Sequence, residues 1–242
     1  MLKRTIPVFF IFLFLLFTFK SHSVFTADWR SASREPAGIA PIAAEHPEAI
    51  VQVYAARAFS WRGYFSVHSW IATKLPNAED YRVYQVVGWR SLYDQPVLSI
   101  EEEYPDRYWF DNRPEIIQDI RGDLAEEIIE DLDNIVDSYP YKRQYILWPG
   151  PNSNTFTAWV GRKIPELRLD LPSTAIGKDF LGTDLFSSAP SGTGYQLSVF
   201  GIFGVLLAAE EGVEVNIAGL VFGLDPLDLT IKLPLFGKIG FN

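Results

Sequence analysis

The chain has no cysteine and only three histidines. The first absence excludes structural disulfides, thiolate zinc sites, a cysteine nucleophile and a lipid-modified N-terminal cysteine. His22 lies in the N-terminal leader and His46 in a proline-flanked segment, so only His68 falls inside the expected folded body. This distribution argues against a multi-histidine metal site. We expect no metal and no cofactor.

Signature motifs and positive charge are also scarce. There is no Walker A loop, dinucleotide fingerprint, G-x-S-x-G elbow or H-E-x-x-H helix. The 21 basic residues are outnumbered by 30 acidic ones, which gives a net charge of -9. Nucleic-acid binding requires a basic face, and no Lys/Arg stripe is present. We therefore expect no nucleic-acid partner.

The N-terminus has the layout of an export signal. Lys3 and Arg4 precede an apolar run over residues 6–19, and the small residues Ser21 and Ser23 follow it. Cleavage after Ser23 would make residues 1–23 a signal peptide, whereas retention would make them an anchor in the inner membrane. Both alternatives place the body in the cell envelope on the periplasmic side, with the membrane as a partner of the N-terminal segment.

The remaining chain divides into a spacer, a core and a C-terminal region. Residues 24–48 are rich in Ala, Pro and Ser and predict an irregular spacer. Residues 49–169 predict an α+β core, because alternating and helical periodicities follow each other along the chain. Within it we expect strands at 50–57, 64–74, 81–90, 97–102 and 144–148, and helices at 114–138 and from Ser153 to about 163.

Residues 170–242 predict a long loop followed by an apolar β meander. The uncharged run at 195–209 is too short to span a bilayer as a helix. Turn residues at Glu211-Gly212 and Asp225-Pro226 favour three antiparallel strands. A membrane-inserted segment is the alternative, so contact of residues 195–224 with the membrane stays open.

The segment Trp148-Pro149-Gly150-Pro151-Asn152-Ser153-Asn154-Thr155-Phe156 places Ser153 at or beside the N-terminus of a helix. Unsatisfied backbone N–H groups and the positive end of the helix dipole meet there, as in an oxyanion site beside a nucleophile. Ser and Asn are also preferred helix caps. Capping and chemistry are thus both consistent with Ser153.

His68 occupies a strand in which Ser66, His68 and Trp70 share one face. A lone strand histidine is usually structural. A catalytic histidine needs a group that orients it, and Gln85 or Tyr84 on the hairpin partner is placed to do so, since no acid lies between residues 81 and 90.

The order of a histidine strand, a hairpin partner, a helix and the Asn152-Ser153 helix start resembles the circularly permuted NlpC/P60 branch of the papain-like superfamily, which includes lecithin retinol acyltransferase-like proteins. The resemblance covers roughly residues 50–163 and implies a papain-like core. It implies Ser153 as nucleophile in the cysteine position and His68 as general base, whereas the residue that orients His68, Gln85 or Tyr84, is not given by the resemblance. Trp70, Asn152 and Asn154 would then contact the substrate.

A closer resemblance is to an uncharacterised bacterial family, domain-of-unknown-function family 3750. Four segments carry it, and together they span most of the expected exported body: Val67-His68-Ser69-Trp70, Pro105-Asp106-Arg107-Tyr108-Trp109-Phe110, the Trp148–Phe156 segment, and Leu171-Pro172-Ser173-Thr174-Ala175-Ile176-Gly177-Lys178-Asp179. This resemblance implies no activity.

A run of acids, Glu101-Glu102-Glu103, ends one expected strand. Paired carboxylates serve glycosidic chemistry or calcium binding, but a charge run is more often a solvated strand end.

Two functions therefore compete. The first is a serine-dependent amidase, esterase or acyltransferase that acts on peptidoglycan or on a lipid-linked envelope substrate. The second is a catalytically inactive envelope protein that binds a glycan or lipid, or serves as a scaffold at the membrane.

Overall fold

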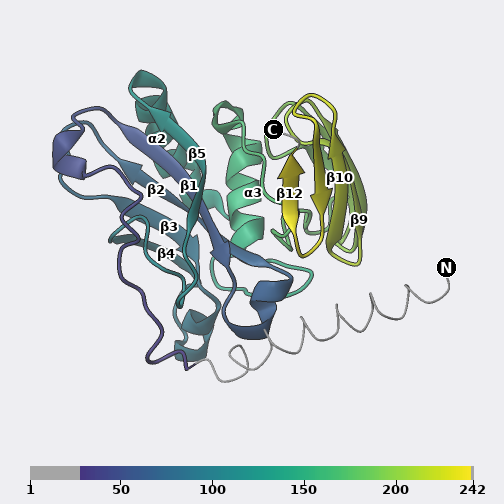
Figure 1. Ribbon diagram of the computed structural model, residues 1–242, viewed down its shortest axis with the longest axis horizontal. Helices are drawn as coiled ribbons and strands as arrows, with labels where there is room; N and C mark the ends of the chain where they lie inside the picture. Colours follow the sequence, from purple (N-terminus) through teal and green to yellow (C-terminus); the bar gives the residue numbers. More distant parts are fainter. Residues whose placement is uncertain (1–27, 241–242) are drawn as a thin grey trace, which may run out of the picture.

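The computed structural model describes residues 28–240, which form two antiparallel sheets with helices between them. The α+β class is thus confirmed (Figure 1). The expected signal or anchor at residues 1–23 lies outside the described residues. No helix within residues 28–240 is long and apolar enough to cross a membrane.

The first sheet has five strands in the order β4-β3-β2-β1-β5. Their bounds are β1 Ile50–Arg57, β2 Val67–Lys74, β3 Arg82–Val86, β4 Leu98–Glu102 and β5 Glu115–Arg121. The central strands β1 and β2 are buried almost throughout, because both faces of this sheet are covered. The strands expected at 50–57 and 97–102 are confirmed within a residue.

Two helices cover one face of the five-stranded sheet. The helix α2 (Asp123–Ile135) buries Ala125, Ile128, Ile129 and Leu132, which recur every three or four residues and so lie on one side. The helix α3 (Ser153–Lys163) packs on β2 and β3, and Figure 1 shows it between the two sheets. Short 3-10 turns complete the helical elements: η1 Ala43–Glu45, η2 Ser60–Tyr64, η3 Gly88–Tyr93, η4 Val136–Ser138 and η5 Pro165–Leu167.

The single helix expected at 114–138 is wrong in its first part. Residues Glu115–Arg121 form β5, which pairs with β1, and Gly122 (φ 73°) separates this strand from α2. The apolar spacing of Ile116, Ile117 and Ile120 suits either structure. This segment forms a strand because β1 offers an edge to pair with, and pairing there satisfies the backbone hydrogen-bonding groups of both strands.

Two further expectations fail for a related reason. Residues 144–148 form no strand, since the amides of Gln144 and Ile146 bond to carbonyls within the same loop, those of Tyr141 and Pro151. The strand expected at 81–90 ends at Val86 and continues as η3. In both segments, backbone N–H and C=O groups form hydrogen bonds within local turns, so they do not pair with a neighbouring strand.

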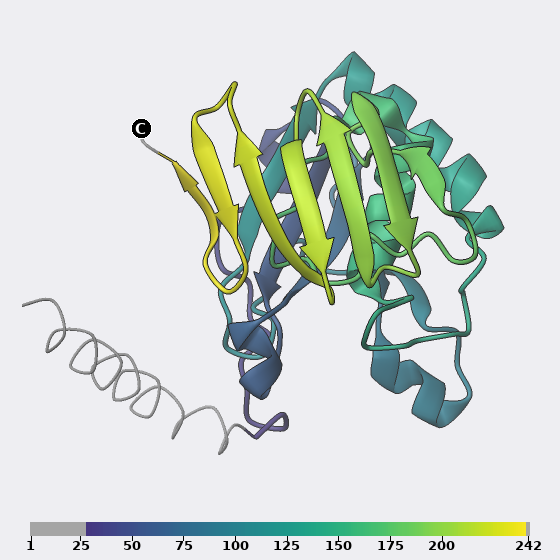
Figure 2. The same cartoon turned by 90° about the vertical axis from the view of Figure 1, so that its right-hand side faces the viewer.

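The second sheet has seven strands in sequence order, so it is a meander (Figure 2). Their bounds are β6 Phe186–Ser188, β7 Gly194–Val199, β8 Phe203–Ala208, β9 Gly212–Ile217, β10 Leu220–Asp225, β11 Thr230–Leu233 and β12 Gly237–Gly240. Turns lie beside Glu211-Gly212 and after Asp225, as expected. Further turns at Phe200-Gly201 and Ala218-Gly219 divide the expected three strands into more, so that residues 195–209 form β7 and β8.

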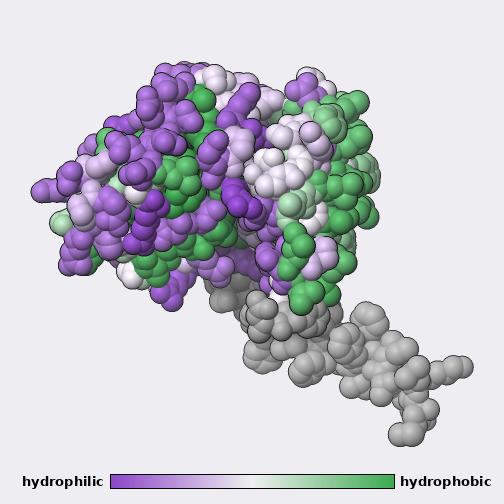
Figure 3. All heavy atoms as spheres, turned by 90° about the horizontal axis from the view of Figure 1, so that it is seen from above, coloured by the Kyte–Doolittle hydropathy of each residue, from purple (hydrophilic) through white to green (hydrophobic). Residues whose placement is uncertain are grey.

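The faces of this second sheet are reversed relative to an ordinary amphipathic sheet. The side towards α3 carries buried polar residues such as Gln196, Ser198, Glu214, Asn216 and Lys232. The other side, which we call the outer face, consists of exposed apolar side chains and runs along the side of the molecule away from α3 (Figure 3). Its members are Phe186, Tyr195, Leu197, Val199, Phe203, Val205, Leu207, Val213, Val215, Ile217, Phe222, Leu224, Ile231 and Ile239.

Candidate functional site

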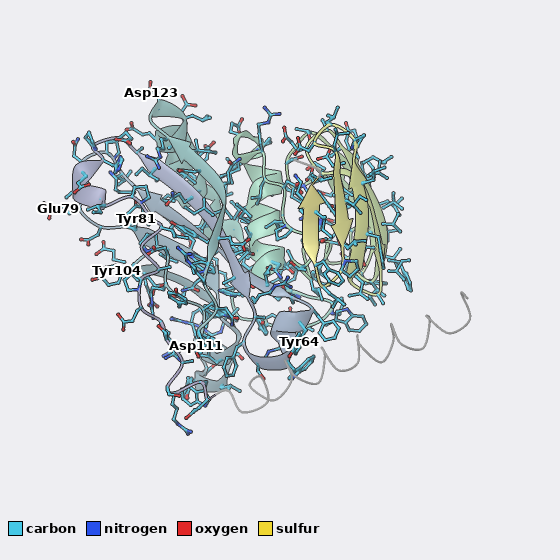
Figure 4. All side chains as sticks on the ribbon, in the orientation of Figure 1. Tyr64, Glu79, Tyr81, Tyr104, Asp111 and Asp123 are labelled. Atoms are coloured by element: carbon cyan, nitrogen blue, oxygen red, sulfur yellow. The ribbon has the colours of Figure 1, made fainter. Side chains whose placement is uncertain are left out.

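The five-stranded sheet separates two apolar clusters. Alternate residues of β2 belong to different clusters: Val67 and Ile71 pack with α2 and α3, whereas Trp70 and Ala72 pack on the opposite face. Figure 4 places the labelled Tyr81 and Tyr104 on the side of the sheet away from α3. We call this side the distal face of the five-stranded sheet.

Two segments without regular structure cover the distal face. The spacer approaches the loop after β4, where the amides of Ile39 and Ala40 donate to Asp106 Oδ2 at 2.6 and 3.1 Å. The amide of Tyr108 donates to the carbonyl of Glu35 at 2.9 Å. These bonds fix the 105–110 segment over the sheet.

That segment places Trp109 in the middle of an aromatic stack. Its ring lies 3.6 Å from the ring of His68 at an interplanar angle of 9°, and 5.5 Å from that of Trp89 at 25°. His68 also stacks on Trp70 at 5.6 Å, and the Trp70 indole donates to the carbonyl of Pro105 at 2.8 Å. Four rings from three parts of the chain thus form one wall.

A series of polar contacts extends from His68, one of these four rings. Gln85 Nε2 donates to Glu103 Oε1 at 2.8 Å, which leaves Gln85 Oε1 to accept from His68 Nε2 at 3.2 Å. The proton of a neutral His68 therefore resides on Nε2. Glu103 also forms an ion pair with Arg107.

A second carboxylate lies two residues earlier on the same face. Glu101 accepts from Arg90 Nη1 at 2.6 Å and from Ser99 Oγ at 2.7 Å. These two hydrogen bonds lower the pKa of Glu101, whereas burial raises that of Glu103 despite Arg107. Burial also lowers the pKa of His68 to about 3, so this histidine is neutral at ordinary pH.

Gln85, Glu101 and Glu103 border a pocket with a volume of about 190 Å³. Aromatic side chains form part of its lining, and arginine, glutamate and glutamine side chains supply donors and acceptors at fixed positions. The residues that line it are Arg34, Trp70, Val83, Gln85, Val87, Trp89, Arg90, Ser99, Glu101, Glu103, Tyr104, Arg107, Tyr108, Trp109 and Phe110. We call it the tryptophan pocket.

The start of α3 is a second polar centre, on the other side of the sheet. Asn152 caps the helix, and its Oδ1 accepts from the amides of Asn154 and Thr155 at 3.0 and 3.1 Å. The Asn152 amide group donates to the carbonyls of Leu147 and Ile176. Ser153 follows as the first residue of α3 and is buried.

Asn154 connects this helix start to β2. Its Nδ2 donates to the carbonyls of Val67 and Ile176 at 3.0 and 2.8 Å, and its Oδ1 accepts from Ser69 Oγ at 2.9 Å. Asn152 and Asn154 thus hold the backbone of neighbouring segments in place, which occupies the groups that substrate contact would require.

The sequence-predicted site residues are therefore divided between two places. His68, Gln85 and Trp70 lie together on the distal face, and the expected contact between His68 and Gln85 is present. Ser153, Asn152 and Asn154 lie at the start of α3, which packs against the other face. The structure does not bring His68 to Ser153, because the sheet runs between them.

Trp89, Arg90, Arg107 and Trp109 also belong to the distal-face site, although the sequence alone assigns them no ligand-binding role. The Pro105–Phe110 segment was visible as a motif, and the Glu101–Glu103 run as paired acids. Their joint position was hidden because it depends on how the loop after β4 folds back over the sheet.

A buried ionic network joins the segment between η5 and β6 to the second sheet. Lys178 forms an ion pair with Glu214, which also accepts from Lys232 Nζ at 2.9 Å. Asp179 accepts from Asn216 Nδ2 at 2.7 Å and from Gln196. Although burial favours its neutral form, the carboxylates of Glu214 and Asp179 raise the pKa of Lys178. The network explains why the inner face of this sheet is polar.

Among the described residues, no group of three or more His, Asp or Glu side chains is arranged to hold a metal ion.

Fold and site together define an α+β domain with an aromatic and charged pocket on one side and an apolar sheet on the other. The chain belongs to the family described as Protein of unknown function (DUF3750), whose model matches residues 48–180. The match spans the five-stranded sheet, both α-helices and the lining of the tryptophan pocket except Arg34, and it ends beside Lys178 and Asp179. No curated protein and no solved structure matches the chain.

Proposed function

We propose that this protein binds a glycan of the cell envelope in the tryptophan pocket. The observation that carries the proposal is the group of Trp70, Trp89 and Trp109 rings that line the pocket beside Gln85, Glu103 and Arg107. A sugar ring presents apolar C–H faces and a rim of hydroxyl groups. Aromatic rings suit the faces, and fixed donors and acceptors suit the hydroxyls.

The cellular setting of the proposal comes from the N-terminal sequence. A leader that exports or anchors the chain places the pocket on the periplasmic side of the envelope, where peptidoglycan is the abundant glycan. A disaccharide-peptide fragment of peptidoglycan is thus the ligand class we assign to the pocket.

This proposal corresponds to the catalytically inactive alternative. A Ser153-dependent amidase, esterase or acyltransferase needs a base within hydrogen-bonding reach of the Ser153 hydroxyl. His68, the base expected for that reaction, faces the opposite side of the sheet and hydrogen-bonds to Gln85. A distant papain-like relationship, supported by the order of the His68 strand and the Asn152-Ser153 helix, fits an inactive branch.

The test is calorimetric titration with soluble peptidoglycan fragments. We expect wild type to bind, and Trp89→Ala to weaken binding at least tenfold, because Trp89 is the exposed ring of the stack. Trp61→Ala is the matched control, since Trp61 is similarly exposed but does not line the pocket. No binding by wild type, or equal losses in both variants, would contradict the proposal.

A second candidate, glycoside hydrolysis, is favoured by the opposite pKa shifts of Glu101 and Glu103 on one pocket wall. A carboxyl group with a raised pKa beside one that stays ionised is the pair that glycosidases use as acid and as base or nucleophile. Release of reducing ends from peptidoglycan by wild type, abolished in Glu103→Gln, would establish hydrolysis. Binding without such release assigns the pocket to recognition alone.

A further inference from the structure

The outer face of the seven-stranded sheet is apolar along every strand. An antiparallel sheet with one solvated face normally turns its polar side chains outward. Here the strand alternation is inverted, so that Glu214 and Asn216 point inward while Val213, Val215 and Ile217 point outward. In residues 186–240, the outward strand positions carry no charged side chain. This pattern suits an apolar surface packed against the outer face.

The edges of the sheet argue against extension by strand pairing. Its edge strands β6 and β12 have three and four residues. Very short edge strands are a common protection against edge-to-edge association. Contact through the face is therefore the mode of association that this sheet favours.

Charge favours a protein over a bilayer as the occupant. Surfaces that lie on membranes use lysine and arginine to attract anionic headgroups. Residues 186–240 contain two basic side chains, and both are ion-paired: Lys232 with Asp170 and Glu214, and Lys238 with Asp170 and with Asp228 in the turn after β10. The whole chain has a net charge of -9.

The size and uniformity of the face fit a second copy of this chain. With strand spacings of about 4.8 Å and rises of about 3.3 Å per residue, the seven strands, which have three to six residues each, form a face roughly 30 Å across and at most ~20 Å long. That area approaches the ~800 Å² per partner of a standard stable interface. In a two-fold pairing each face meets its own copy, and a face without charges pairs with itself without burying an unpaired ion.

We propose that two copies of this chain pack face to face through their outer faces, as the two sheets of a β-sandwich. Such sheets pack ~10 Å apart with interdigitated side chains. Val215 lies on the central strand β9, beside Val205 on β8 and Phe222 on β10. It is thus close to its own copy in a two-fold pairing centred on the sheet.

Because the chain has no cysteine, a single introduced thiol reports this contact in the full-length protein. We expect Val215→Cys to give a covalent dimer of twice the chain mass when intact cells are treated with a short bismaleimide that spans ~10 Å. Glu130→Cys on the exposed side of α2 is the matched control and should give several-fold less dimer. Equal yields from the two positions would overturn the proposal.

A charge placed in the interface supplies the second readout. Val205→Lys added to Val215→Cys should reduce the covalent dimer several-fold, because pairing would bury the ammonium group. Glu127→Lys, at an exposed position of α2, should leave the yield unchanged. Resistance to protease checks that each variant is folded. A Val215→Cys thiol that reacts with a lipid-phase reagent in place of forming dimer would assign the face to a bilayer and overturn the second copy.

Discussion

His68 is a titratable side chain held neutral between aromatic rings. Burial lowers its pKa from 6.5 to about 3 in the folded protein. Between these values the unfolded chain binds a proton that the native state does not. The contribution of His68 to stability is therefore fully present above about pH 6.5 and is lost as the pH falls towards 3.

This linkage predicts a pH-dependent effect of His68→Phe, which keeps an aromatic ring beside Trp109 and removes the titration. The wild-type free energy of unfolding should fall relative to that of the variant by up to about 1.4 kcal/mol per pH unit below pH 6.5. Urea unfolding of both proteins from pH 4.5 to 7.5 measures the difference. Parallel profiles would show that His68 titrates normally.

Asn152 and Ser153 are adjacent residues with different expected contributions. Asn152→Ala removes a helix cap, worth about 0.5 to 2 kcal/mol, and also removes the side-chain donor of the Leu147 carbonyl, whereas the Ile176 carbonyl keeps Asn154 Nδ2. Ser153→Ala should cost about 1 kcal/mol or less, because Asn152 already caps α3. Chemical denaturation measures the loss of stability in each variant. A larger loss for Ser153→Ala than for Asn152→Ala would show that Ser153 is the capping residue.

At the scale of elements, the position of the second sheet depends on a buried ionic network. Lys178→Met removes one partner of Glu214 and leaves the neighbouring Asp179 with less compensation. Breaking a buried pair in this way costs about 3 to 5 kcal/mol. Thermal and urea unfolding should show this loss, whereas Lys163→Met at the exposed end of α3 should change little. Equal effects would mean that the network does not hold the sheet.

Local sequence predicted several elements well because local forces determine them. The β-branched run of β1 and the Asn152 cap of α3 each specify their structure within a few residues. The segment at 114–138 shows the limit: its isoleucines suit a helix or a strand, and only the unpaired edge of β1 makes Glu115–Arg121 a strand. The meander has more strands than the sequence predicts because further turns occur at Phe200-Gly201 and Ala218-Gly219. Where a strand ends depends on its pairing partners, which the local sequence does not specify.

At the scale of the whole molecule, the α+β class and the C-terminal meander could be predicted from the sequence. The positions of the site residues relative to one another could not. Strand alternation put His68 and Trp70 on one face and Val67 on the other, as observed. The face of the sheet that α3 covers depends on tertiary packing, which the local sequence does not specify. That face determines whether His68 lies beside Ser153 or beside Trp109. Sequence also could not show that the polar face of the second sheet points inward, because that depends on Lys178 and Asp179 being buried beneath it.

The central claim, glycan binding in the tryptophan pocket, is tested most directly by the indole resonances of the protein. The chain has seven tryptophans, so a ¹⁵N-labelled sample gives seven indole N–H signals to assign by single substitution. On titration with a soluble peptidoglycan fragment, the signals of Trp89 and Trp109 should shift most, with Trp70 following. Those of Trp29, Trp61, Trp148 and Trp159, outside the pocket, should stay in place. Shifts confined to those four, or none at all, would contradict the account.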